Sequence, residues 1–248
     1  MLREVRLVIA CLIVLSVPQI LYNIFQESAL AAEDHCLDRS HVHLRFSRWG
    51  TSAVINSLKA TGTYLQFPDE DSSRPIKYDE YSVTIESMPP GVTPEMFLAE
   101  WERDFNKAID SPLFTFISEF ERRTTNTPVI GDIYDIDLPV DDGSVMLVEA
   151  SPSHFILQTI TTPFSETGSH PESGVRQFGF EKNLDGTVTF YTRSANQVHI
   201  TPADGIDDTL DNPLGKYIQG IGWGDMIESI GERLGGPNFD QGLECGVP

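Results

Sequence analysis

The sequence predicts an α+β fold: a curved antiparallel sheet with two short helices, and a long C-terminal helix packed on its concave face. Two features carry this prediction. Short runs of alternating apolar and polar residues follow one another between Ile133 and Arg193, separated by turn residues. Connections this short cannot cross over a sheet, so neighbouring strands must be antiparallel. An amphipathic segment from Pro213 to Leu234 then supplies a helix long enough to cover the apolar face.

The beginning of the chain is typical of a secretory signal. Arg3 and Arg6 precede an apolar run from Leu7 to Val17, and small residues at 29–32 come before two acidic residues. We expect residues 1–31 to be a signal peptide, and a retained signal anchor is the alternative. Both interpretations place the folded part outside the cytoplasm, as a secreted or periplasmic protein. An anchor would also tether it to a membrane through its N-terminal segment.

Residues 32–77 are predicted to form an N-terminal extension and linker. A strand over Val42 to Phe46, a short helix over Ser52 to Lys59 and an extended piece over Thr63 to Phe67 are expected in it. The acidic stretch Pro68 to Pro75 has the composition of a loop. The domain proper is therefore placed at residues 78–236, and residues 237–248 form a C-terminal tail.

Regular structure in the domain begins with a half-buried strand from Tyr78, in which apolar and polar residues alternate. Thr93 is predicted to cap a helix that has Pro94 at its first position and apolar residues at helical spacing as far as Ile109. A second helix is expected over Leu113 to Arg122. Five strands follow, over Ile133 to Leu138, Val145 to Ala150, Phe155 to Thr161, Val175 to Glu181 and Val188 to Arg193.

The C-terminal helix includes glycines at positions 220, 222, 224 and 231. Each lowers the helix propensity by about 1 kcal/mol relative to alanine. Such a sequence indicates either close approach to the sheet or a local break, and the missing side chains leave room. A loosely filled helix over a concave apolar sheet predicts a ligand cavity between them.

This order of elements resembles the helix-grip fold of the START-like (SRPBCC, polyketide cyclase-like) superfamily over residues 78–234. A weak sequence similarity adds to it, in Thr159-Ile160-Thr161, in His170-Pro171-Glu172-Ser173-Gly174 and in Phe190 to Ser194. The resemblance implies an apolar small molecule or lipid held between sheet and helix, without implying catalysis. The candidate ligand-binding residues are then Phe155, Leu157, Arg176, Phe178, Phe180, Phe190, Arg193, Tyr217, Trp223 and Met226.

Composition and motifs exclude several other functions. The chain carries 17 Lys and Arg against 37 Asp and Glu, a formal net charge of −20, which repels phosphate backbones and disfavours nucleic acid as a partner. There is no Gly-x-Ser-x-Gly elbow, phosphate loop or dinucleotide fingerprint. We therefore expect no cofactor. The oligomeric state is left open.

Two alternative functions remain at this stage. His170 and Glu172 are weak candidates for an acid/base pair of a cyclase or hydrolase, with Arg176 or Arg193 as an anion clamp, although such a turn more often only shapes a hairpin. An envelope interaction protein, with its function in residues 32–77, is the other alternative. Enzymatic activity is thus uncertain and is not the favoured interpretation.

The sequence predicts a structural disulfide and no metal site. Cys36 and Cys245 are the two cysteines beyond the signal segment, and one disulfide between the chain ends is favoured over two free thiols. No metal site is expected. Neither of two candidate groups has the spacing of a zinc or calcium site, the first being His35, Cys36, His41 and His43, and the second Asp204, Asp207, Asp208 and Asp211.

Overall fold

The computed structural model of the chain describes residues 49–68, 76–109, 119–137, 142–161, 172–198, 213–235, 239–241 and 245–246. Several predictions concern residues outside these ranges. They are the signal segment, the strand at 42–46, the pairing of Cys36 with Cys245, the histidine group at 35–43, His170 and the aspartate run at 204–211.

The fold is the predicted α+β helix-grip arrangement. One antiparallel sheet has the strand order β2-β3-β4-β5-β6-β7-β1-β8, with β9 also paired to β1. The strands are β1 (Lys77–Ile85), β2 (Glu119–Arg122), β3 (Ile133–Asp137), β4 (Gly143–Ala150), β5 (His154–Thr159), β6 (Glu172–Lys182), β7 (Val188–Val198), β8 (Phe239–Gln241) and β9 (Cys245–Gly246). The predicted C-terminal tail thus contributes two short strands to the sheet.

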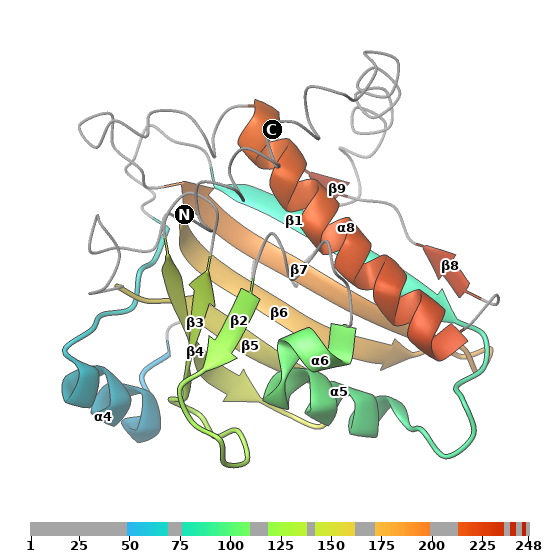
Figure 1. Cartoon of the computed structure of the whole chain (residues 1–248), viewed down its shortest axis with the longest axis horizontal. Coiled ribbons are helices and arrows are strands. Elements are labelled where there is room, and N and C mark those ends of the chain that lie inside the picture. Colours follow the sequence, from blue (N-terminus) through green and yellow to red (C-terminus); the bar gives the residue numbers. More distant parts are fainter. Residues whose placement is uncertain are drawn as a thin grey trace, which may run out of the picture.

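The sheet curls around one face, which carries most of the helices (Figure 1). A register shift between Leu147 and Glu149 marks a bulge in β4 against β5, and bulges of this kind increase the bend of a strand. The concave face carries one hydrophobic core, which includes Val83, Leu147 and Phe178. A second core on the convex face includes Met146, Ile156 and Val175. The alternation of side chains along each strand separates the two cores.

Two short helices cover one end of the concave face, α5 (Pro94–Arg103) and α6 (Phe105–Ile109). The Oγ1 of Thr93 accepts a hydrogen bond from the amide of Met96, which confirms the predicted cap. The sequence predicted one continuous helix here. Asp104 breaks it, because its backbone is extended and its carboxylate accepts from the amide of Lys107 to start α6.

The predicted second helix at 113–122 is wrong in its last part. Residues 119–122 form strand β2, which pairs with β3 through Phe120 and Ile136 among others. The apolar spacing that indicated a helix is therefore overridden by tertiary pairing at the edge of the sheet. Residues 110–118 lie outside the described part of the chain.

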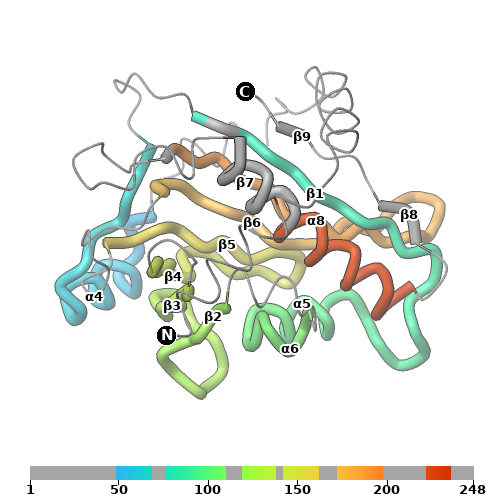
Figure 2. Tube along the Cα trace, turned by 45° about the horizontal axis from the view of Figure 1, so that its top comes forward, coloured from blue at the N-terminus to red at the C-terminus, as the bar shows by residue number. Residues whose placement is uncertain are grey.

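The long helix α8 (Pro213–Gly235) runs alongside β1 across the concave face, as Figures 1 and 2 show. Its C-terminal half packs into the concave core through Met226, Ile227, Ile230 and Leu234. Ser229 and Arg233 then bond the last carbonyl groups of α6, and Arg233 also pairs with Glu100 at 2.9 Å. These contacts fix the C-terminal end of α8 on α5 and α6.

The helix α4 (Ser52–Thr61) lies on the opposite, convex face, away from the other helices (Figure 1). Val54 is fully buried there, in the core that Trp49 and Leu58 also join. Leu65 adds an isolated bridge to Ile160 where a longer extended piece was expected. Part of the predicted extension is thus packed on the sheet. Across the described ranges, no helix has the length and apolar character needed to cross a membrane.

Candidate functional site

The half of the concave face beneath α5, α6 and the end of α8 is filled by aromatic rings. Trp101 packs edge-on against Phe105, Phe155 and Phe178, with ring centroids 5.2 to 6.2 Å apart. Phe155 and Phe178 stack on each other at 5.0 Å. Each of these rings is at most 1% exposed, so protein atoms surround it on all sides. The expected hollow is therefore not found in this half.

Most of the predicted ligand-binding residues belong to this filled half. Phe155, Leu157, Phe178, Phe180, Phe190 and Met226 are all buried in the concave core, in one cluster. Their packing favours a role in stability, and a ligand contact from them stays a prediction. Tyr217 lies in the part of α8 where only the course of the backbone is described.

The other half of the concave face changes from apolar to polar. Along β7 the side chains that follow Phe190 on the same face are Thr192, Ser194 and Asn196, and each is at least nine-tenths buried. Asp79 on β1 and Arg176 on β6 flank Ser194 in the strand register. We call these five residues the concave polar patch.

The centre of the concave polar patch is an ion pair. One guanidinium nitrogen of Arg176 lies 2.7 Å from both carboxylate oxygens of Asp79. The other donates to Oγ1 of Thr192 at 3.2 Å. The side chain of Trp223, on α8, covers this pair, with the guanidinium carbon 4.0 Å from the ring centroid. Arg176 and Trp223, both in the predicted ligand-binding set, thus lie in contact, and their role in binding stays a prediction.

The sequence prediction missed Asp79, Thr192, Ser194 and Asn196. A signal was present, because the apolar face of β7 continues as polar residues at every second position after Phe190. The predicted strand ended at Arg193, three residues before Asn196. Without the correct strand end, this polar alternation could not be assigned to a face.

Arg193 does not belong to the patch. Strand alternation places it on the convex face, where its Nε donates to Gln177 at 2.9 Å and the guanidinium stacks on Tyr191. Glu80 and Glu181 lie 3.8 and 3.5 Å from its terminal nitrogens. Burial raises the pKa of Tyr191, so the phenol stays neutral beside this cation. Arg176 and Arg193 are therefore not parts of one anion clamp.

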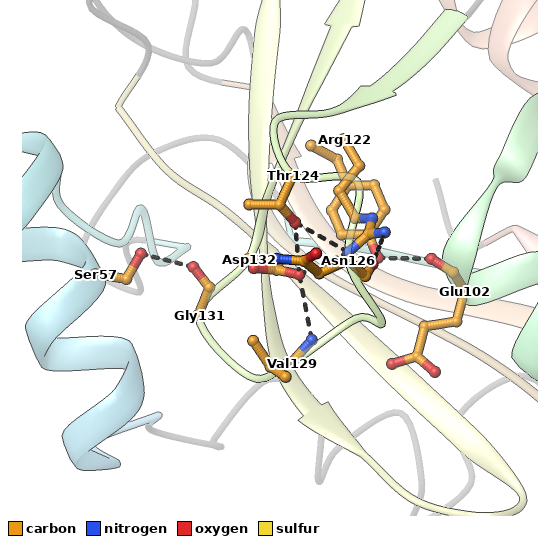
Figure 3. Close-up of polar contacts among 9 residues, drawn as sticks. Ser57, Glu102, Arg122, Thr124, Asn126, Val129, Gly131 and Asp132 are labelled. Carbon is orange, nitrogen blue, oxygen red and sulfur yellow. Dashed lines mark hydrogen bonds and ion pairs between the residues drawn. The ribbon is translucent and has the colours of Figure 1, made fainter.

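A second buried charge pair, Arg122 with Asp132, joins the start and the end of the β2–β3 connection (Figure 3). Asp132 Oδ2 accepts from Arg122 at 2.8 Å, from Thr124 at 3.1 Å and from the amide of Val129 at 3.2 Å. Arg122 also donates to the carbonyl of Asn126. All three of these donors come from the β2–β3 connection itself, so the network stabilises the conformation of this connection.

Burial changes the pKa values of two side chains near this network, Glu102 and Tyr134. Desolvation raises the pKa of Glu102 above its usual range, against the opposing effect of Arg122. Burial likewise raises the pKa of Tyr134, whose hydroxyl donates to the backbone carbonyl of Glu102 at 2.6 Å. The phenol proton of Tyr134 is thus held by a backbone carbonyl.

A serine, a histidine and a glutamate form one hydrogen-bonded chain in the β4–β5 hairpin. His154 lies 3.0 Å from Oγ of Ser151 and 2.9 Å from Glu149. The amides of Ser153 and His154 donate to the same serine oxygen, so it caps its own turn. A hydroxyl used in this way is a structural element of the hairpin rather than a nucleophile.

The predicted acid/base pair cannot be assembled from the described residues. Glu172 is the first residue of β6, whereas His170 lies outside the described ranges. In the described part of the chain, no group of three or more His, Cys, Asp or Glu side chains could hold a metal ion.

Comparisons with known proteins assign no function to this chain. No family model matches the sequence, and no curated protein matches it. Solved structures that are similar include a hypothetical protein from Helicobacter pylori, with 10% identity, a TM-score of 0.42 and coverage of 67% of this chain and 94% of that one. Norcoclaurine synthase from Thalictrum flavum gives 8% identity, a TM-score of 0.41, and coverage of 66% and 97%.

The di-domain ARO/CYC StfQ of the steffimycin biosynthetic pathway is also similar, at 12% identity and a TM-score of 0.38. That match covers 64% of this chain and 51% of StfQ. At such identities and scores, none of the three assigns a family, a ligand or a reaction to this chain.

Proposed function

We propose that the protein binds an amphipathic small molecule or lipid between α8 and the concave polar patch, outside the cytoplasm and without catalysis. The observation that carries the proposal is the patch itself. Thr192, Ser194 and Asn196 are buried on the concave face, beside an Arg176–Asp79 pair whose side chains are 11% and 18% exposed, while the other half of this face holds an aromatic core. Buried polar groups of this kind are costly unless each finds a partner.

Contacts of α8 support this location for the ligand. The C-terminal half of α8 is fixed on α6 through Arg233 and Ser229. Toward its N-terminal half the helix passes over the patch, where Trp223 covers Arg176. An apolar part of the ligand would pack along α8, and its polar part would meet the patch. The signal segment that the sequence predicts at residues 1–31 supports a location outside the cytoplasm.

Native mass spectrometry of protein purified from its own host tests the proposal. We expect a bound molecule of lipid or metabolite size that an organic solvent releases. Trp223→Ala should lower the bound fraction about tenfold, because it removes the cover of the patch. Trp49→Ala, on the convex face, is the matched control and should retain the molecule. Wild-type protein without any adduct, before and after incubation with host lipid extract, would contradict the proposal.

A further inference from the structure

We infer that the ligand of the concave polar patch presents an uncharged hydrogen-bond donor, a hydroxyl or an amide N–H, to Oδ1 of Asn196. The same site should discriminate against carboxylates and other anions. This inference deepens the proposed function and rests on it. It follows from the direction of the hydrogen bonds and from the charge of the patch.

The hydrogen bonds determine which atom of Asn196 is free. The Oγ of Ser194 lies 2.8 Å from Oδ2 of Asp79, and it must donate its single proton there because a paired carboxylate only accepts. That oxygen can then only accept from Asn196, 3.2 Å away, so the amide of Asn196 must turn its Nδ2 toward Ser194. The amide orientation is therefore set by the network.

The Oδ1 of Asn196 is left without a hydrogen bond in the part of the chain that the structure describes. Asn196 is only 8% exposed and lies on the face that α8 covers. A buried carbonyl oxygen without a donor is unfavourable, so a donor that reaches it gains affinity. Since Oδ1 can only accept, the missing group must be a donor.

The charge of the patch favours a neutral donor. Arg176 has a carboxylate partner in Asp79, so the pair is electrically neutral. An anion would find no uncompensated cation there, and its own oxygens would face the unpaired oxygen of Asn196. Both effects act against a carboxylate ligand.

The other unpaired buried atoms do not mark a site of this kind. They are Oδ1 of Asp79, Nε1 of Trp101, Nε of Arg122 and Oγ of Ser173. The Asp79 oxygen already has a cation beside it, because a guanidinium nitrogen of Arg176 lies 2.7 Å away. Trp101 lies in the aromatic core and Arg122 in the β2–β3 network. Strand alternation from Val175 places Ser173 on the convex face. Asn196 therefore supplies the atom of this set that lies in the concave polar patch and has no charged partner beside it.

The test compares three probes that share one alkyl chain and differ in the head group: decanol, methyl decyl ether and decanoate. Their affinities for full-length protein would be measured by displacement of the neutral dye Nile red. For the wild type we expect decanol to bind about tenfold more tightly than either of the others, the effect of one hydrogen bond to a buried acceptor.

Two variants should change this order in different ways. Asn196→Leu removes the acceptor, so decanol should fall to the affinity of the ether. Asp79→Asn leaves the cation of Arg176 unpaired, so decanoate should become the tightest of the three. Gln177→Leu is the control, since Gln177 lies next to Arg176 on the opposite face and the wild-type order should be kept. If Asn196→Leu does not fold, Asn196→Asp replaces it. The added carboxylate should lower the affinity for decanoate further and raise the affinity for a fourth probe, decylammonium.

The outcomes separate the two proposals. Equal affinity of the wild type for alcohol, ether and carboxylate would overturn the inference and leave the binding function standing. A wild-type preference for decanoate would overturn it as well. If the wild type binds none of the probes and carries no molecule from its host, the proposed function fails, and this inference fails with it.

Discussion

At the scale of single residues, Gly174 shows how closely β6 and β7 approach beside the patch. A Cβ added to Gly174 would lie 2.5 Å from the carbonyl oxygen of Ala195 and 2.6 Å from Cα of Asn196. Both are backbone atoms, which cannot move without changing the strand. A residue without a side chain is therefore required at this position, for packing rather than for an unusual φ angle.

Gly174→Ala should lower the free energy of unfolding by about 2 kcal/mol, within the range for overpacking a closely packed site. Urea denaturation measures the effect. Gly224→Ala is the matched control, because a Cβ there meets no atom within 4 Å. Because alanine has a higher helix propensity than glycine, this change should raise the free energy of unfolding by up to about 1 kcal/mol. If Gly174→Ala leaves the free energy of unfolding unchanged, the two strands must separate more easily than their contacts indicate.

The raised pKa of Glu102 predicts a pH dependence of stability. An acid whose pKa is higher in the folded state favours folding below its unfolded value, about 4.3, and this contribution is lost as pH rises through the folded value. Glu102→Gln should therefore match the wild type near pH 4 and be the more stable protein at pH 7. Thermal melts across this range measure the difference.

Glu95→Gln gives the opposite sign and serves as control. A hydrogen bond from Lys182, 2.7 Å away, lowers the pKa of Glu95, so its contribution is present at neutral pH and is lost as pH falls. The glutamine variant should be slightly less stable than the wild type at pH 7. Identical pH profiles for both variants would contradict the burial of Glu102.

At the scale of elements, the β2–β3 connection depends on the Arg122–Asp132 pair, whose side chains are 6% and 10% exposed. Removing one partner leaves the other charge buried, which typically costs about 3 to 5 kcal/mol. We expect Arg122→Ala to show a loss of this size in chemical denaturation. Arg123→Ala should cost less than about 1 kcal/mol, because Arg123 and Asp135 form an exposed pair. Equal losses would contradict the difference in burial.

The edge strand β2 is protected by a side chain. Asn106 accepts from the amide of Phe120 and donates to its carbonyl, at 3.2 and 2.8 Å, as a neighbouring strand would. Asn106→Ala should expose these groups and promote edge-to-edge association, which light scattering measures as a concentration-dependent mass. Asn183→Ala, in a hairpin turn away from this edge, is the control. A mass equal to that of the wild type at every concentration would contradict this role.

The sequence predicted an element correctly where its pattern of apolar residues fitted only one type of secondary structure. Strong alternation and short turns gave the strands at 133–137, 154–159 and 188–198 correctly in type, and the Thr93 cap was confirmed. The helix at 113–122 was wrong at 119–122, because Phe116, Ile117 and Phe120 fit a helical stripe equally well. The pairing of Arg176 with Asp79, 97 residues apart, depends on strand order, which no local pattern specifies.

At the scale of the whole molecule, the concave face is divided into two halves with different roles. The aromatic half, centred on Trp101, fixes α5, α6 and the end of α8 to the sheet. The polar half contains Asp79, Arg176 and Asn196 under the other part of α8. Under the proposed function, this division would separate stability from binding, and a ligand would exchange at the patch without disturbing the aromatic core.

A crystal structure of the protein purified with its bound molecule tests this account most directly. We predict electron density for a ligand between α8 and strands β1, β6 and β7, with a donor atom within hydrogen-bond distance of Oδ1 of Asn196. A space filled by the protein's own side chains, with Asn196 bonded to one of them, would contradict the account.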